Sequence, residues 1–139
     1  MSERYPKDVK LVIKQFPLPA HGYAKKAAIA ALAAGRQGKF WDMHEKLFAN
    51  QKDLSDAKVE AIAGELDLNL EQFDKDLKDP ALTSFIDKDT NDGFKAGVQG
   101  TPAIFINGKS FTQRSLQGFE QVIDAELKKV QSQGGQTSR

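Results

Sequence analysis

The sequence of 139 residues contains no cysteine. This absence excludes structural disulfides, cysteine-ligated zinc, iron–sulfur clusters and any thiol nucleophile within the chain. Histidine is nearly as scarce, with only His21 and His44. These two lie far apart, without the spacing of a helical His-x-x-x-His pair, so we expect neither a metal nor another cofactor. Acid–base roles are possible for both, but we favour His21 closing a proline-rich turn and His44 at the edge of a helix interface.

An excess of one charge is also missing, because 20 Lys and Arg residues face 19 Asp and Glu residues. This balance gives no electrostatic reason to expect nucleic acid or an anionic membrane as a partner. The longest weakly apolar stretch, 27–34, is far shorter than the ~20 residues that span a bilayer. The residues after Met1 lack the apolar core of a signal peptide. We therefore expect the chain as written to be soluble and cytoplasmic.

The length suits one domain, since domains cluster around ~100–150 residues. Val9–Phe16 has apolar side chains at alternate positions and predicts a strand, which Pro17 and Pro19 would end. The pattern then becomes helical. Five helices are expected, over Tyr23–Ala34 and Lys39–Asn50 and after the start signals Ser55, Asn69 (with Gln72 in a capping box) and Asp79-Pro80.

The pattern changes again near the C-terminus. Ala103–Ile106 is a short β-branched run, Asn107-Gly108 is a strong hairpin signal, and Lys109–Thr112 would be the returning strand. Ser115 can cap a final helix, and residues 131–139 form a polar tail that we expect to be disordered. The order of strand, helices, hairpin and helix indicates an α/β (α+β-like) domain.

Three features carry alternative interpretations. Trp41 and the nine phenylalanines could form an aromatic binding surface, but helical spacing favours a core role. Ser115 lacks a Gly-x-Ser-x-Gly elbow, so we favour a cap over a nucleophile. Asp87–Gly93 has the alternating oxygens of a calcium loop, but the glycine stands at position seven and no glutamate stands at position twelve, so we favour a solvated loop.

The segment Gly97-Val-x-Gly-Thr-Pro-x-x-Phe-Ile-Asn-Gly108 resembles the cis-proline loop of DsbA-family thiol–disulfide oxidoreductases of the thioredoxin superfamily. A second block resembles the helical insertion of the same family: Phe16-Pro-Leu-Pro-x-His21, Gly38-Lys-Phe-Trp-x-Met-His-x-x-Leu-Phe48 and Leu66–Phe73. The resemblance runs from about Tyr5 to Val130. It implies a thioredoxin-like fold over residues 1–130, with an inserted helical subdomain at about 22–95 and an incomplete sheet.

The chain departs from that family at its start. Members carry a central strand and a Cys-x-x-Cys helix before the strand that Val9–Phe16 resembles. The resemblance therefore implies an N-terminally truncated member. Disulfide exchange needs a thiolate, so we expect this chain to be redox-inactive by itself and to have no catalytic residue. Full-length members are usually periplasmic or extracytoplasmic.

The missing strand would lie between the strands at Val9 and Ala103, and its loss would leave two open edges, with Tyr23, Phe40 and Trp41 lining part of the opening. Open edges pair with other chains, so we expect a homo-oligomer, a strand-swapped dimer or a partner strand.

The resemblance also marks Gly100, Thr101 and Pro102 as a substrate-binding loop, where a peptide or protein substrate would pair with the backbone. The alternative is a tight turn that only sets the following strand. Two functions remain open at this point. The chain is a redox-inactive relative of disulfide oxidoreductases, or it is a non-catalytic module that binds a peptide or subunit at the Pro102 loop and the open sheet edge.

Overall fold

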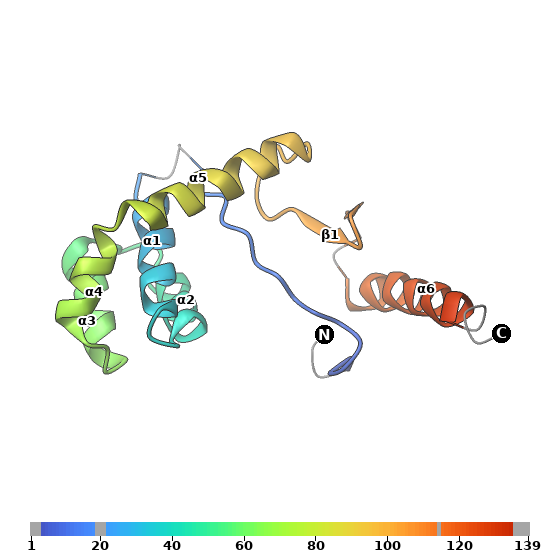
Figure 1. Ribbon diagram of the computed structural model, residues 1–139, viewed down its shortest axis with the longest axis horizontal. Coiled ribbons are helices and arrows are strands. Elements are labelled where there is room, and N and C mark those ends of the chain that lie inside the picture. Colours follow the sequence, from blue (N-terminus) through green and yellow to red (C-terminus); the bar gives the residue numbers. More distant parts are fainter. Residues whose placement is uncertain (1–3, 19–21, 114, 135–139) are drawn as a thin grey trace. The chain divides into compact units, whose positions relative to one another are not determined.

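The computed structural model describes residues 4–18, 22–113 and 115–134 (Figure 1). Pro19 and His21, which the sequence analysis singled out, lie outside the described residues. The chain divides into two compact units. The helical unit comprises residues 14–101, and the hairpin unit comprises residues 1–13 together with 102–139. Each unit is described by itself below.

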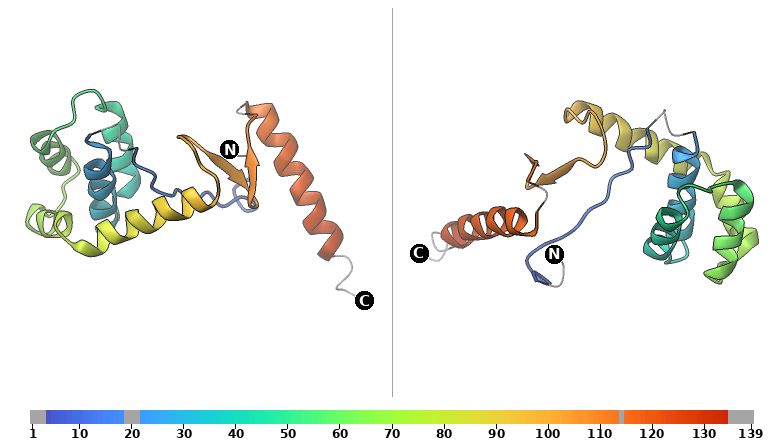
Figure 2. Two further views of the ribbon diagram at one scale, coloured as in Figure 1. Left: turned by 90° about the horizontal axis from the view of Figure 1, so that it is seen from above. Right: turned by 180° about the vertical axis from the view of Figure 1, so that it is seen from behind.

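The helical unit contains five helices (Figure 2): α1 (Ala24–Gly35), α2 (Phe40–Ala49), α3 (Asp56–Glu65), α4 (Leu70–Leu77) and α5 (Pro80–Lys95). All five were predicted from the sequence. Helix α1 packs against each of the other four. Its buried alanines, Ala30, Ala31, Ala33 and Ala34, confirm the expected close packing, because small side chains let neighbouring backbones approach.

The larger core side chains come from the helices around α1. Met43, Ile62 and Phe73 are fully or almost fully buried in one cluster with the α1 alanines. Burying such side chains is the main favourable contribution to folding. The core of the helical unit is therefore a small-residue helix surrounded by bulkier partners.

Side-chain caps begin three of these helices, as predicted. Ser55 Oγ accepts from the Lys58 N–H at 3.1 Å. Asn69 Oδ1 accepts from the Gln72 N–H at 3.0 Å, and Asp79 Oδ1 accepts from the Ala81 N–H at 2.9 Å. Each bond satisfies an amide that has no partner within its own helix.

In a capping box, the Gln72 side chain would accept from the Asn69 N–H, but another residue does so here. The Asn69 N–H donates to Gln37 Oε1 at 2.8 Å, and Gln37 Nε2 donates back to the Asn69 carbonyl at 3.2 Å. Gln72 instead donates to Asp76 Oδ1 at 3.1 Å. Gln37, which follows α1, therefore takes the role expected of Gln72. It can do so because its side-chain amide both donates and accepts a hydrogen bond.

One arginine joins three helices of the unit. Arg36 Nη1 donates to Asp76 Oδ1 at 2.7 Å and to Asp79 Oδ2 at 2.8 Å. These bonds raise the pKa of Arg36, while the Ala81 N–H and then Arg36 lower the pKa of Asp79. Asp76 is buried, so its charge requires such partners. The arginine thus ties the end of α1 to α4 and to the start of α5.

The hairpin unit contains strands β1 (Ile104–Ile106) and β2 (Lys109–Phe111) and helix α6 (Leu116–Gly134). The strands are antiparallel, with Phe105 opposite Ser110. Asn107 and Gly108 have φ values of 48° and 80°, the left-handed geometry of a two-residue type I′ turn. This confirms the predicted hairpin.

Helix α6 begins as predicted, since Ser115 Oγ accepts from the Gly118 N–H at 3.0 Å. Phe111 of β2 is buried and its ring lies tilted against that of Phe119 of α6, with ring centroids 4.5 Å apart. Tyr5 also reaches α6, where its hydroxyl donates to Asp124 Oδ1 at 2.8 Å, a bond that raises the tyrosine pKa. One face of the hairpin therefore rests on α6.

Three expectations need correction. Val9–Phe16 forms no strand, because the sheet in the described part of the chain holds only β1 and β2, and a strand exists only with a hydrogen-bonded neighbour. Asp87–Gly93 is a continuous part of α5, so the helix expected after Asp79-Pro80 extends through it towards Phe94, and the solvated loop is wrong. Helix α6 continues to Gly134, past the boundary at 130, while residues 135–139 lie outside the described residues.

Within this part of α5, Lys88 pairs with Asp92 at 3.1 Å and Thr90 Oγ1 donates to the Ile86 carbonyl at 2.8 Å. Ile86 itself is buried. Burial of one face therefore outweighs the low helix propensity of the aspartates and asparagine.

Candidate functional site

The loop marked by the sequence begins where α5 ends. Gly97 has a φ of 83°, and the Val98 N–H donates to the Gly93 carbonyl at 3.0 Å, an arrangement that closes a helix with a left-handed residue. Gly100, Thr101 and Pro102 follow, all exposed, and lead through Ala103 into β1. The chain also passes from the helical unit to the hairpin unit between Thr101 and Pro102.

Strand β1 has one paired and one open edge. It pairs with β2, and no other strand is found among the residues that the structure describes. In a two-residue hairpin the pair beside the turn exchanges both hydrogen bonds, so the next pair, Phe105 and Ser110, directs its N–H and C=O groups outward. Phe105 therefore offers a donor and an acceptor on the open edge, three residues after Pro102.

Residues Val9–Ile13 are a second apolar stretch without a strand partner in the described structure. The side chains of Leu11 and Val12 are 69% and 60% exposed. Val9–Ile13 and β1 both belong to the hairpin unit. An exposed segment with apolar side chains and no strand partner is a template for pairing with another strand.

An aromatic stripe lies on α2 and comprises Phe40, Trp41, His44 and Phe48. The Phe40 and Trp41 rings are 5.3 Å apart, and His44 lies 5.8 Å from each and 4.7 Å from Phe48. Trp41 is 49% and Phe48 62% exposed, so the expectation that both belong to the core is wrong. Met43 and Leu47 take the buried face of the helix instead.

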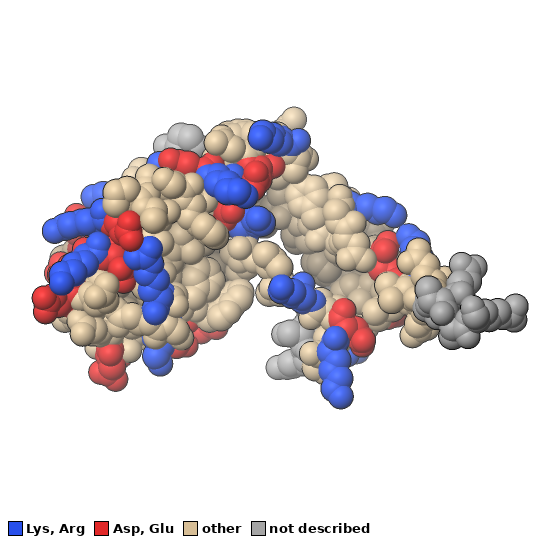
Figure 3. Space-filling model, in the orientation of Figure 1, with Lys and Arg blue, Asp and Glu red and all other residues tan. Residues whose placement is uncertain are grey.

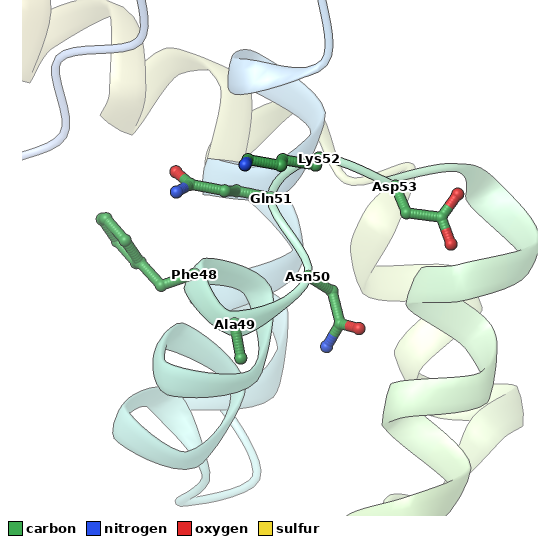
Figure 4. Close-up of a pocket in the computed structure, with 6 residues that line it drawn as sticks. All are labelled: Phe48, Ala49, Asn50, Gln51, Lys52 and Asp53. Atoms are coloured by element: carbon green, nitrogen blue, oxygen red, sulfur yellow. The ribbon is translucent and has the colours of Figure 1, made fainter.

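A pocket of about 330 Å³ lies at the end of α2, lined by residues 48–53 (Figure 4). Its side chains do not converge. Phe48, Gln51 and Lys52 point to one side, while Asn50 and Asp53 point to the other. Ligand sites usually combine an apolar lining with a few convergent polar groups, so this pocket does not make a binding site.

Charged side chains of both signs are interspersed on the face shown in Figure 3. Many form ion pairs, such as Lys46 with Glu65 at 2.8 Å and Lys25 with Asp87 at 2.9 Å. Within the described residues no group of three His, Asp or Glu side chains is placed to hold a metal ion. None of the described helices combines the length and the apolarity needed to cross a bilayer.

Tyr23 and Asp56 contact each other, and both have shifted pKa values. Burial and then the hydrogen bond to Asp56, at 2.5 Å, raise the pKa of Tyr23. The tyrosine and Lys26 in turn lower the pKa of Asp56. This pairing fixes the residue before α1 to the first turn of α3.

The sequence signature of the family described as Thioredoxin matches residues 3–125. The chain belongs to the thioredoxin family. A solved structure agrees: a thioredoxin-like oxidoreductase from Silicibacter pomeroyi has a TM-score of 0.66 and 28% identity to this chain. The match covers 84% of this chain and 66% of the other. These findings confirm the thioredoxin-like fold, mostly helical with a small two-stranded sheet, and support a DsbA-like member of the superfamily.

Curated relatives extend the comparison. The chain is 40% identical over 103 residues to an Na(+)/H(+) antiporter from Salinispora arenicola, and 32% identical over 102 residues to one from Herminiimonas arsenicoxydans. Each match covers 73% of this chain but 16% of the antiporter. The chain thus spans about one sixth of the length of these relatives.

The sequence located the loop and the hairpin and, through the family resemblance, an open edge on the strand at Ala103, but it missed the exposure of the α2 stripe. The open edge at Phe105 follows from the hairpin register, which the Asn107-Gly108 turn already encodes. The exposure of the α2 stripe was not encoded in spacing, because Phe40, His44 and Phe48 have the same four-residue repeat that core positions have.

Proposed function

We propose that the chain is a non-catalytic thioredoxin-like module that binds an extended polypeptide segment at the open edge of β1, beside Pro102. The open edge at Phe105 carries this proposal. An incoming strand gains main-chain hydrogen bonds there without disturbing the β2 side of the hairpin, as in strand addition to other sheet edges. Pro102 belongs to the same unit as Phe105 and precedes it by three residues, so the chain that leaves the loop leads directly into this edge.

The proposal includes the absence of redox activity in the chain alone. Disulfide exchange requires a thiolate to attack a disulfide sulfur, and the sequence contains no thiol. In an insulin-reduction assay with dithiothreitol we expect the rate of the blank, with or without the chain. Turnover above the blank that depends on the chain would contradict this part of the proposal.

A second candidate function follows from family membership. The match covers 66% of the S. pomeroyi oxidoreductase, so a longer polypeptide could carry thiols in a segment that this chain does not include. Translation of the DNA upstream of the Met1 codon tests this. A Cys-x-x-Cys motif in the same reading frame, without an intervening stop codon, would support an oxidoreductase, and an immediate in-frame stop would favour the binding module.

Peptide binding at the edge is tested with a fluorescein-labelled eight-residue peptide of alternating valine and threonine. We expect Phe105→Pro to weaken binding at least about fivefold, because proline removes the outward N–H that the ligand needs. The matched control is Ser110→Pro, which removes the corresponding N–H from the opposite edge and should leave the affinity unchanged. Fluorescence anisotropy measures both.

Equal affinities for the two proline variants would contradict the proposed edge. A second copy of the chain is another ligand for the same edge, in agreement with the dimer expected from the sequence. Sedimentation equilibrium of the wild type therefore accompanies the titration. Concentration-dependent association that Phe105→Pro abolishes would identify the bound strand as the chain's own.

A further inference from the structure

The turn of the hairpin, Asn107-Gly108, is the only point in the sequence where a glycine follows an asparagine. Asn50 precedes a glutamine, Asn69 a leucine and Asn91 an aspartate. The backbone nitrogen of the following residue can approach the asparagine side chain most freely when that residue is glycine, because glycine has no Cβ and few backbone restrictions. Asn107 is therefore chemically different from the other three asparagines.

The turn leaves both groups of this pair accessible. Asn107 and Gly108 are exposed, with φ values of 48° and 80°. In a two-residue turn the hydrogen bonds join the flanking residues, here Ile106 and Lys109. The Gly108 N–H thus takes no part in the ladder, and its nitrogen is the backbone atom that follows Asn107 directly.

The hairpin that carries the turn is short. Each strand has three residues, and within the described part of the chain the two strands pair only with each other. A two-stranded hairpin is marginally stable unless it packs on another element, which is α6 here, through Phe111 and Phe119. Local opening of the turn therefore costs little free energy, and it allows the Gly108 nitrogen to reach the Asn107 side chain.

One hydrogen bond to α6 restrains the Asn107 side chain. Its Nδ2 donates to Glu126 Oε2 at 3.3 Å. The other carboxylate oxygen of Glu126 lies 3.0 Å from Lys129 Nζ and 3.8 Å from Lys109 Nζ. Lys129 and then Asn107 lower the pKa of Glu126. The acceptor of the Asn107 amide is therefore a negative charge at neutral pH.

We propose that Asn107 is a site of spontaneous deamidation and that Glu126 is the positioning residue that slows the reaction. The Gly108 nitrogen attacks Asn107 Cγ and forms a cyclic succinimide. The bond from Cγ to Nδ2 breaks, and ammonia leaves with the proton from the Gly108 nitrogen. Water then adds across one of the two ring C–N bonds and leaves aspartate or isoaspartate. The overall reaction consumes water and releases ammonia, with no oxidation or reduction.

The product alters the contact between the hairpin and α6. A carboxylate at position 107 has no N–H to donate to Glu126, and the two like charges repel each other. Isoaspartate also routes the main chain through the former side chain, which disturbs the turn. Deamidation therefore replaces an attraction at this end of the hairpin with a repulsion.

The test follows the full chain during incubation in mildly alkaline buffer. Peptide mapping by mass spectrometry locates the modified asparagine, and methylation by protein isoaspartate methyltransferase detects isoaspartate. We expect Asn107 to react at least about tenfold faster than Asn69, which leucine follows and which caps a helix. Asn69 thus serves as a control within the same molecule.

Three variants test the role of Glu126. Glu126→Ala should accelerate deamidation at least about threefold, because the Asn107 amide loses its acceptor. Glu126→Gln keeps an acceptor oxygen and should return the rate towards that of the wild type. The matched control is Lys129→Ala, which removes the partner of the other carboxylate oxygen and should change the rate by less than about twofold. Circular dichroism verifies that each variant retains its helical content.

Asn107→Asp reproduces one product and tests its effect on the hairpin. Hydrogen exchange at the Lys109 amide, measured by NMR, should accelerate at least about threefold, because the repulsion from Glu126 opens the turn. Adding Glu126→Gln to this variant removes the second charge and should restore slow exchange. Unchanged exchange in Asn107→Asp would overturn the effect on the hairpin.

The remaining outcomes bear on the site itself. Modification of Asn107 no faster than that of Asn69 would overturn the deamidation site. Equal rates in the wild type and Glu126→Ala would overturn the role of Glu126. A cross-link between Lys129 and Asn107 also releases ammonia, and its detection in the peptide map would overturn Gly108 as the nucleophile.

Discussion

Replacing Phe73 with alanine should destabilise the helical unit by about 3–5 kcal/mol, the usual cost of removing a fully buried phenylalanine. Phe73 is 0% exposed and belongs to the cluster that α1, α2, α3 and α4 share. The substitution leaves a cavity that rigid neighbouring helices cannot fill completely. Urea unfolding followed by far-ultraviolet circular dichroism measures the change.

Phe85→Ala on α5 is the matched control, since Phe85 is exposed. Its unfolding free energy should change by less than about 1 kcal/mol. Similar losses for the two variants would contradict the assignment of Phe73 to the core and of Phe85 to the surface.

Enlarging a core alanine should also lower the stability of the helical unit, in this case by overfilling the core rather than by leaving a cavity. Ala30 is completely buried near the middle of α1. We expect Ala30→Leu to cost about 1–3 kcal/mol of unfolding free energy, because the extra carbons force α1 away from the helices packed on it. Thermal and urea unfolding of the variant measure this loss.

Ala57→Leu adds the same atoms at an exposed position of α3 and serves as the comparison. Its stability should stay within about 0.5 kcal/mol of the wild type. A stable Ala30→Leu variant would mean that α1 does not approach its neighbours as closely as its alanines allow.

Local chemistry made most of the elements predictable from sequence. Ser55, Asn69, Asp79 and Ser115 each mark a helix start because a short polar side chain satisfies an exposed N–H of the first turn. Asn107-Gly108 marks the hairpin because both residues tolerate positive φ. These interactions join residues within four positions of one another, so they can be predicted without reference to the rest of the chain.

The errors arose where the outcome depends on a distant partner. The alternation in Val9–Phe16 is a real strand pattern, but a pattern does not show whether a neighbouring strand is present to pair with it. Phe48 has core-like spacing, yet no described helix covers it. The partner of Asp89 could not be read from the sequence, since it is the backbone of Gln15, 74 residues away.

The candidate site was partly predictable for the same reason. The Gly100–Pro102 loop was found through a family motif, and the direction of the Phe105 backbone followed from the turn type. The contact between Phe16 and Gly93 on α5 required the three-dimensional structure, because four helices separate these residues in the sequence.

The division of the chain into units also has a consequence for folding order. Residues 14–101 are continuous, so the helical unit has all its contacts available before the C-terminal part has been synthesised. The hairpin unit unites residues from both ends of the polypeptide, including the bond between Tyr5 and Asp124. Its closure spans a long loop, and forming contacts across such a loop costs entropy unless the intervening residues are already compact. The helical unit can therefore fold before the two segments of the hairpin unit meet.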